Sequence, residues 1–302
     1  MGFTHTLLLG LFAGATIVLG LPLARLRSPR HSRATAALRV YLTAASVGVL
    51  VFILWDVLAQ AWDIITTGLS QPGHHDGQLV APVGLAALLS VGLGVGLGGL
   101  AGFERWLTRE RVRPTTRSVT TLAALLEGPG AMAAPAITAD VPVGPGGREL
   151  SPASRLALLI AIGIGLHNFG EGLAIGTSAA TNEITVATLL VTGFALHNAT
   201  EGFGTIAPLA ADPDRPSWGF LLLMGLIGGG PTLAGTVVGS QVTNAPMRLV
   251  FLTVAAGSIL YVIIQLVGTA VRGARLSALY WGVWTGVVAG FGTDLILTAG
   301  GA

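Results

Sequence analysis

The chain has 302 residues, of which 52% are hydrophobic and only 10% are charged, and its formal net charge is +2. A soluble domain of this size needs far more polar surface, so we predict an all-α integral membrane protein in which residues 1–302 form a single transmembrane domain. Cysteine is absent, which excludes disulfides, thiolate metal sites and cysteine redox chemistry.

Eight apolar runs follow one another along the chain, each long enough to cross the ~30 Å hydrocarbon core of a bilayer with about 20 residues. The runs are too long and continuous for the strands of a barrel, which leaves helices as the spanning form. The predicted helices cover about residues 4–24, 38–60, 79–104, 152–180, 184–210, 217–241, 247–271 and 277–300.

The arginines give these helices an orientation. Lysine is absent, and 15 of the 16 arginines fall in the connections that follow odd-numbered helices. Positive residues concentrate on the cytoplasmic side, so these connections, including a long one at about 105–151, are predicted to be cytoplasmic and both termini to lie outside. Since topology accounts for the basic residues, we expect membrane lipid and no nucleic acid as a partner.

The first polar features along the chain belong to the second predicted helix and the loop that follows it. Asp56 lies at membrane depth, where a charge is costly and marks a candidate ion pathway, although a buried hydrogen-bonded acid explains it equally well. His74, His75 and Asp76 lie in the outward loop and could collect metal at an entrance. An ordinary solvated loop is the alternative.

The fourth and fifth predicted helices carry the same polar motif, 30 residues apart. The fourth contains His167, Asn168 and Glu171, and the fifth contains His197, Asn198 and Glu201 at identical spacing. On a helix these three positions share one face within about one turn. If the two helices present these faces to each other, two imidazoles, two carboxylates and two amides converge near the midplane.

Such a set of nitrogen and oxygen ligands suits a divalent cation. Without thiolates it favours Zn²⁺, Fe²⁺, Mn²⁺, Co²⁺ or Cd²⁺ over Cu(I). The alternative is that the six side chains only join helices through hydrogen bonds, but one polar residue per helix would be enough for that. Two further residues are candidates for the ion pathway: Asp294 in the eighth helix, and Ser178, which follows His167 on nearly the same face of the fourth helix.

The repeated HNxxEG motif, the eight spans and the long connection after the third helix resemble the ZIP (ZRT/IRT-like) metal transporters, in particular their GufA-like prokaryotic branch. The resemblance implies a 3+2+3 arrangement of helices with inverted outer repeats, in the inner membrane of a prokaryote. It also implies that His167, Glu171, His197 and Glu201 form the main transport site, with Asn168 and Asn198 beside a neighbouring second site.

Three departures from the family pattern bear on that second site. Gly170 replaces the usual proline of the first motif, and Gly230 stands before Pro231 where a glutamate ligand is usual. Gln265 stands where a carboxylate is common in the seventh helix, and it is kept as a further pathway candidate. We therefore predict a single metal rather than a pair.

The function that follows is secondary transport of a divalent metal, most simply zinc, into the cytoplasm. The metal is substrate, no organic cofactor is implied, and the protein is not expected to be an enzyme. Two alternatives stay open: a membrane metallohydrolase, although the HExxH order of such enzymes is absent, and a metal sensor that does not transport. The sequence does not determine the oligomeric state, and a homodimer is compatible with it.

Overall fold

The computed structural model describes residues 3–25, 33–69, 80–109, 150–180, 184–211, 215–241, 244–272 and 276–299. Within these ranges all regular structure is helical, in eight α-helices and three short 3-10 helices. The α-helices are α1 (Phe3–Ala15), α2 (Arg33–Leu69), α3 (Val80–Arg109), α5 (Pro152–Ala180), α6 (Ile184–Ile206), α7 (Trp218–Gly239), α8 (Ala245–Arg272) and α9 (Leu276–Ala299).

Six segments of the described chain are long and apolar enough to cross a membrane. They are Phe3–Arg25, Val40–Thr67, Val83–Trp106, Pro152–Ala180, Trp218–Gly239 and Pro246–Val271. The predicted class, an all-helical protein with several membrane-spanning helices, is thereby confirmed. The helices α6 and α9 are outside this set, and α6 carries His197, Asn198 and Glu201, which lower its mean hydropathy. A total of eight spans stays a prediction.

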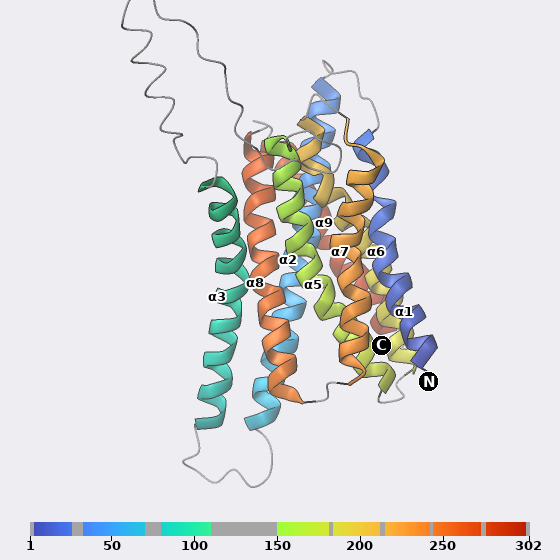
Figure 1. Ribbon diagram of the computed structural model, residues 1–302, viewed down its shortest axis with the longest axis vertical. Coiled ribbons are helices and arrows are strands. Elements are labelled where there is room, and N and C mark those ends of the chain that lie inside the picture. The colour runs from blue at the N-terminus through green and yellow to red at the C-terminus, as the bar shows by residue number, and fades with distance from the viewer. Residues whose placement is uncertain are drawn as a thin grey trace, which may run out of the picture.

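The helices lie side by side along the long axis of the molecule, and α1 begins at the same end of the bundle at which α9 ends (Figure 1). Among the most extensive helix contacts are those of α5 with α7, of α2 with α9 and of α3 with α8. The main apolar core lies between α2, α5 and α8, around residues such as Leu50, Ile160 and Ile259. The helix α3 packs on α8 at one edge of the bundle (Figure 1).

The first predicted helix is not one continuous α-helix. After Ala15 the chain tightens into two 3-10 helices, Thr16–Leu19 and Leu21–Arg25. Pro22 cannot donate a backbone hydrogen bond and disfavours a regular helix through this point. Gly20 lies so close to α6 that an added Cβ would be 2.7 Å from the Ala199 carbonyl oxygen. The apolar run indicates a span, but these two residues make its second half irregular.

Other helices extend beyond their predicted boundaries because no helix-breaking residue ends them there. The helix α2 was expected at 38–60 but runs from Arg33 to Leu69, a length of ~55 Å that exceeds the hydrocarbon core. The helix α3 continues to Arg109, and the rest of the predicted connection up to residue 149 is outside the described residues. In contrast, α5 begins at Pro152 and ends at Ala180, as predicted.

Glycines allow α5 and α7 to approach until their backbones touch. A Cβ at Gly172 of α5 would collide with the carbonyl oxygen of Thr232, and one at Gly235 of α7 with that of Phe169. Small residues at such crossings are the usual means of close helix packing in membranes. The contact fixes the part of α5 that carries the first polar motif.

Candidate metal centre

The two polar motifs lie on α5 and α6, which contact each other. In each motif the histidine and the glutamate are four residues apart, so both side chains leave the helix on one face. The structure brings these two faces together, as the repeated spacing predicts. His167 and Glu171 come from α5, and His197 and Glu201 come from α6.

Glu171 lies between the two imidazoles. Its Oε1 atom is 3.1 Å from Nε2 of His167 and also contacts Nε2 of His197 directly. On the other side, Nε2 of His167 is 3.7 Å from Oε1 of Glu201. The centroids of the two imidazole rings are 6.5 Å apart. The four side chains therefore form one connected cluster.

This cluster is buried, and several of its polar atoms make no hydrogen bond. His167 is 2% exposed, Glu171 5% and Glu201 1%. Among the described residues, Oε2 of Glu171 and both carboxylate oxygens of Glu201 have no hydrogen-bond partner. Buried carboxylates are costly unless a counter-charge and hydrogen bonds compensate them. The free oxygens are thus suited to receive a cation.

The geometry also fits a single ion. One ligand atom each from His167, Glu171 and His197 can be chosen so that all three lie within 4.8 Å of one another. Imidazole nitrogens and carboxylate oxygens are ligands of zinc and of other divalent transition metals. The donor set of the cluster therefore matches the metals predicted from the sequence.

The two asparagines of the motifs are completely buried, and each bonds to a helix other than α5 and α6. Nδ2 of Asn168 donates to the carbonyl oxygen of Gly228 on α7, at 3.0 Å. Nδ2 of Asn198 donates to the carbonyl oxygen of Ala13 on α1, at 3.1 Å. In the part of the chain that the structure describes, the Oδ1 atoms of both side chains have no hydrogen-bond partner. The motif spacing predicts where these amides lie but not these backbone bonds.

A cavity of about 240 Å³ reaches the cluster at His197 and extends to Thr298, the residue before the last one of α9. It lies between α2, α6 and α9, and His197 is part of its wall. A smaller cavity of about 40 Å³ shares part of that wall and extends to His167 and Glu171. Together the two cavities connect the cluster with the end of the bundle.

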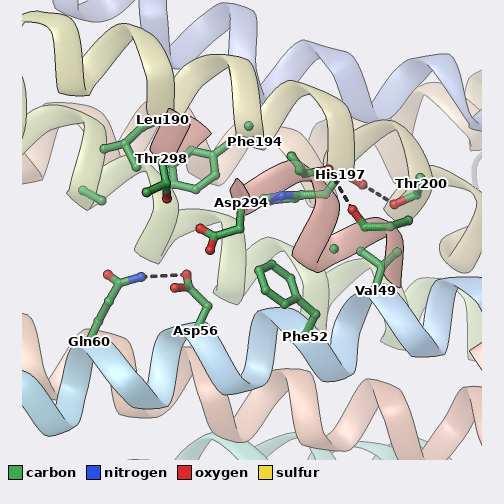
Figure 2. A pocket seen from close by; sticks show the side chains of 15 residues that line it. Val49, Phe52, Asp56, Gln60, Leu190, Phe194, His197, Thr200, Asp294 and Thr298 are labelled. Atoms are coloured by element: carbon green, nitrogen blue, oxygen red, sulfur yellow. Dashed lines mark hydrogen bonds between the residues drawn. The ribbon is translucent and has the colours of Figure 1, made fainter. Parts of the chain in front are cut away.

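Two predicted pathway residues line this cavity. Figure 2 shows the carboxylates of Asp56 and Asp294 pointing toward each other across it. Asp56 accepts a hydrogen bond from Nε2 of Gln60, at 2.8 Å. Phe52, from the same helix as Asp56, lies beside Asp56 and below His197 in the same view. The wall of the cavity therefore carries both acidic and aromatic side chains.

The remaining predicted residues lie elsewhere. Ser178 is half-buried on α5 and does not line the cavity. Nε2 of Gln265 donates to Glu104 of α3, at 2.8 Å, and the hydroxyl of Tyr261 donates to the same carboxylate oxygen. The three loop residues proposed as an entrance, His74, His75 and Asp76, are outside the described residues.

The position on α8 that faces the motif is Ala255 rather than Gln265. A Cβ added at Gly170 would be 3.4 Å from the Cβ of Ala255, and Ala255 lines the smaller cavity. Gln265 is ten residues further along α8, which corresponds to ~15 Å. The structure therefore does not bring Gln265 to the cluster, and it presents a methyl group there instead.

Aromatic and amide residues of the cavity were missed in the sequence. The ring of Phe194 is 5.4 Å from that of His197, measured between centroids, and it lines both cavities. Its position three residues before His197 places it on the same helix face, and Gln60 has the equivalent relation, at four residues, to Asp56. These spacings are the signals from which both residues could have been found.

Comparison with known proteins agrees with this geometry. Residues 143–265 match the family model of the ZIP zinc transporters, a range that contains α5 and α6 with both motifs. No curated protein matches the chain. The long apolar helices indicate a multi-pass membrane protein, and the match shows that residues 143–265, which contain the cluster of histidine and glutamate, belong to the ZIP zinc transporter family.

Proposed function

We propose that this protein is a secondary transporter that moves a divalent metal cation, with zinc as the first candidate, into the cytoplasm through the cluster between α5 and α6. The observation that carries the proposal is the buried cluster of His167, Glu171, His197 and Glu201, whose free carboxylate oxygens adjoin a cavity with two more carboxylates. Membership of the zinc transporter family supports the same conclusion.

The proposed topology has eight spans, both termini outside and a 3+2+3 arrangement with inverted repeats. In that arrangement α1, α2 and α3 correspond to α7, α8 and α9, and α5 corresponds to α6. The symmetry then exchanges the α2 and α9 pair with the α8 and α3 pair, and both are among the most extensive contacts in the bundle. We assign the protein to the GufA-like branch and to the inner membrane of a prokaryote.

Under this topology the cavity opens outward, and the ion meets Asp56 and Asp294 before it reaches the cluster. The acidic wall attracts a cation and offers it oxygen atoms while it loses water. The ion then moves from His197 to His167 and Glu171, which lie further inside. The two carboxylates of the cluster match the charge of one dication, in agreement with a single metal.

The driving force in this proposal is the electrochemical gradient. The sequence contains no phosphate-binding loop, so nucleotide hydrolysis is not invoked. A membrane potential of about 100 mV, negative inside, favours inward movement of a dication by ~4.6 kcal/mol. Transport then requires that the cluster be exposed alternately to the two sides of the membrane.

Uptake by purified protein in liposomes tests the function directly. With an inside-negative potassium diffusion potential, we expect Zn²⁺ to accumulate in protein-containing liposomes above the level in empty ones, and the rate to fall when the potential is removed. A fluorescent zinc indicator inside the liposomes measures the rate. Binding of Zn²⁺ without any flux would contradict transport and favour a sensor.

The pathway role of Asp56 can be tested separately from the cluster. The variant Asp56→Asn is expected to raise the KM for Zn²⁺ uptake several-fold, because the cavity loses one of its two acidic residues, while binding to the cluster persists. The matched control is Asp63→Asn on the same helix, an exposed residue outside the cavity. Equal uptake kinetics in the two variants would remove Asp56 from the pathway.

A further inference from the structure

Both asparagines of the motifs use only one end of their carboxamide in hydrogen bonds. The NH₂ group of Asn168 donates to Gly228 and that of Asn198 donates to Ala13. Both side chains are 0% exposed, and neither Oδ1 atom has a hydrogen-bond partner within the described ranges. A buried acceptor without a partner is costly, so the two oxygens are available for a ligand that would offset this cost.

The two carbonyl oxygens that receive these bonds lie at irregular points of α1 and α7. Ala13 is close to the end of α1 at Ala15, where the 3-10 segment begins, and its oxygen also accepts a bond from the hydroxyl of Thr16. Gly228 lies in the turn before Pro231, which is inside α7 and leaves the neighbouring carbonyl of Ile227 without its usual helical donor. Such points can change conformation more easily than a regular helix.

Neither α1 nor α7 contributes a side chain to the cluster, but the two helices are packed against each other. A Cβ at Gly14 of α1 would collide with the carbonyl oxygen of Gly229, and a Cβ at Gly229 with that of Gly14. The hydroxyl of Thr177 on α5 also donates to the carbonyl oxygen of Gly239 on α7, at 3.3 Å. The two asparagines are the polar links that start one residue after a histidine of the cluster, one from α5 to α7 and one from α6 to α1.

A carboxamide can serve both ends of such a link. Its nitrogen donates to a carbonyl oxygen while its oxygen remains an acceptor. An aspartate of the same shape would offer the oxygen but would place a second oxygen against the backbone carbonyl. Asparagine therefore retains its donor at these positions even though aspartate is the stronger cation ligand.

We propose that Asn168 and Asn198 are positioning residues that transmit occupation of the cluster to α7 and α1. The amide nitrogen of each holds a carbonyl oxygen at the irregular point of its partner helix, and the free Oδ1 turns toward the bound ion. The inference rests on the proposed function because it assumes that a metal binds the cluster. It adds that α1 and α7, which hold no ligand, respond to the metal through two separate bonds.

Hydrogen exchange read out by mass spectrometry tests this transmission. In wild-type protein in nanodiscs, we expect Zn²⁺ to slow exchange severalfold in α5 and α6 and also near residues 13–19 of α1 and 228–232 of α7. In Asn198→Asp the response of α1 should be lost while that of α7 remains. In Asn168→Asp the response of α7 should be lost while that of α1 remains. Each variant is the matched control of the other.

Affinity and flux provide a second readout. Both aspartate variants keep an oxygen ligand, so their Kd for Zn²⁺ should stay within a few-fold of the wild type or decrease. Their uptake rate should fall about tenfold, because a bond between a ligand helix and its neighbour is lost. If a variant does not fold, Asn198→Ala and Asn168→Ala should lose the same helix response and in addition bind Zn²⁺ more weakly.

The results that would overturn this inference differ from those that would overturn the transport function. If Zn²⁺ neither binds nor crosses the membrane in wild-type protein, the proposed function fails. If Zn²⁺ binds and is transported but α1 and α7 do not respond, or respond equally in the aspartate variants, the function stands and the positioning role fails. Faster uptake in the aspartate variants would likewise make the asparagines simple ligands.

Discussion

Replacing Glu171 with glutamine is expected to abolish metal uptake and to weaken Zn²⁺ binding by at least ~100-fold. Oε1 of Glu171 is the atom that both imidazoles share, and its second oxygen is buried without a partner. Glutamine keeps the shape of the side chain but removes the negative charge. Removing one partner from a buried charge pair typically costs 3–5 kcal/mol, which is the origin of the expected factor.

Zn²⁺ titration calorimetry and liposome uptake together check this result. The matched control is Glu104→Gln, the same substitution in another transmembrane helix, where the carboxylate binds Tyr261 and Gln265 instead of the cluster. The control variant should bind and transport Zn²⁺ at nearly the wild-type level. A Glu171→Gln variant that binds Zn²⁺ like the control would exclude Glu171 as a ligand.

The cluster could be predicted from the sequence because the residues of each motif are close together in the sequence. The spacing of His167 and Glu171 places both on one helix face, and the same spacing on the next helix makes a shared site the simplest arrangement. Intramembrane charge is expensive, so two carboxylates at matching positions of adjacent helices indicate a binding site rather than packing alone. The structure brings the four side chains together in agreement with this prediction.

The parts that could not be predicted depend on contacts between distant segments. The bonds of Asn168 to Gly228 and of Asn198 to Ala13 join residues 60 and 185 positions apart. The same holds for the cavity, which needs α2, α6 and α9 to converge. The family pattern predicts that Gln265 lies near the site. In the structure, the rotation and register of α8 direct this side chain toward Glu104 instead.

Replacing Gly235 with valine is expected to destabilise the protein by about 3 kcal/mol or more. A Cβ at this position would collide with the carbonyl oxygen of Phe169, and the other nearest atoms are the carbonyl carbon of Phe169, at 2.9 Å, and the backbone nitrogen of Leu173, at 3.1 Å. All three belong to the backbone of α5, which cannot move aside as a flexible side chain does. Overpacking of this kind typically costs 1–3 kcal/mol and more where backbone is displaced.

The matched control is Gly98→Val on α3, where an added Cβ has no atom of the described residues within 4 Å. Glycine is a poor helix former, so this variant should be as stable as the wild type or slightly more stable. Thermal melting and size-exclusion chromatography in detergent compare the two variants. Because Phe169 lies between Asn168 and Glu171, Gly235→Val should also weaken Zn²⁺ binding in whatever folded fraction remains. Equal melting temperatures for the two variants would show that α5 and α7 are not in backbone contact. In that case α7 would not hold the first motif in place.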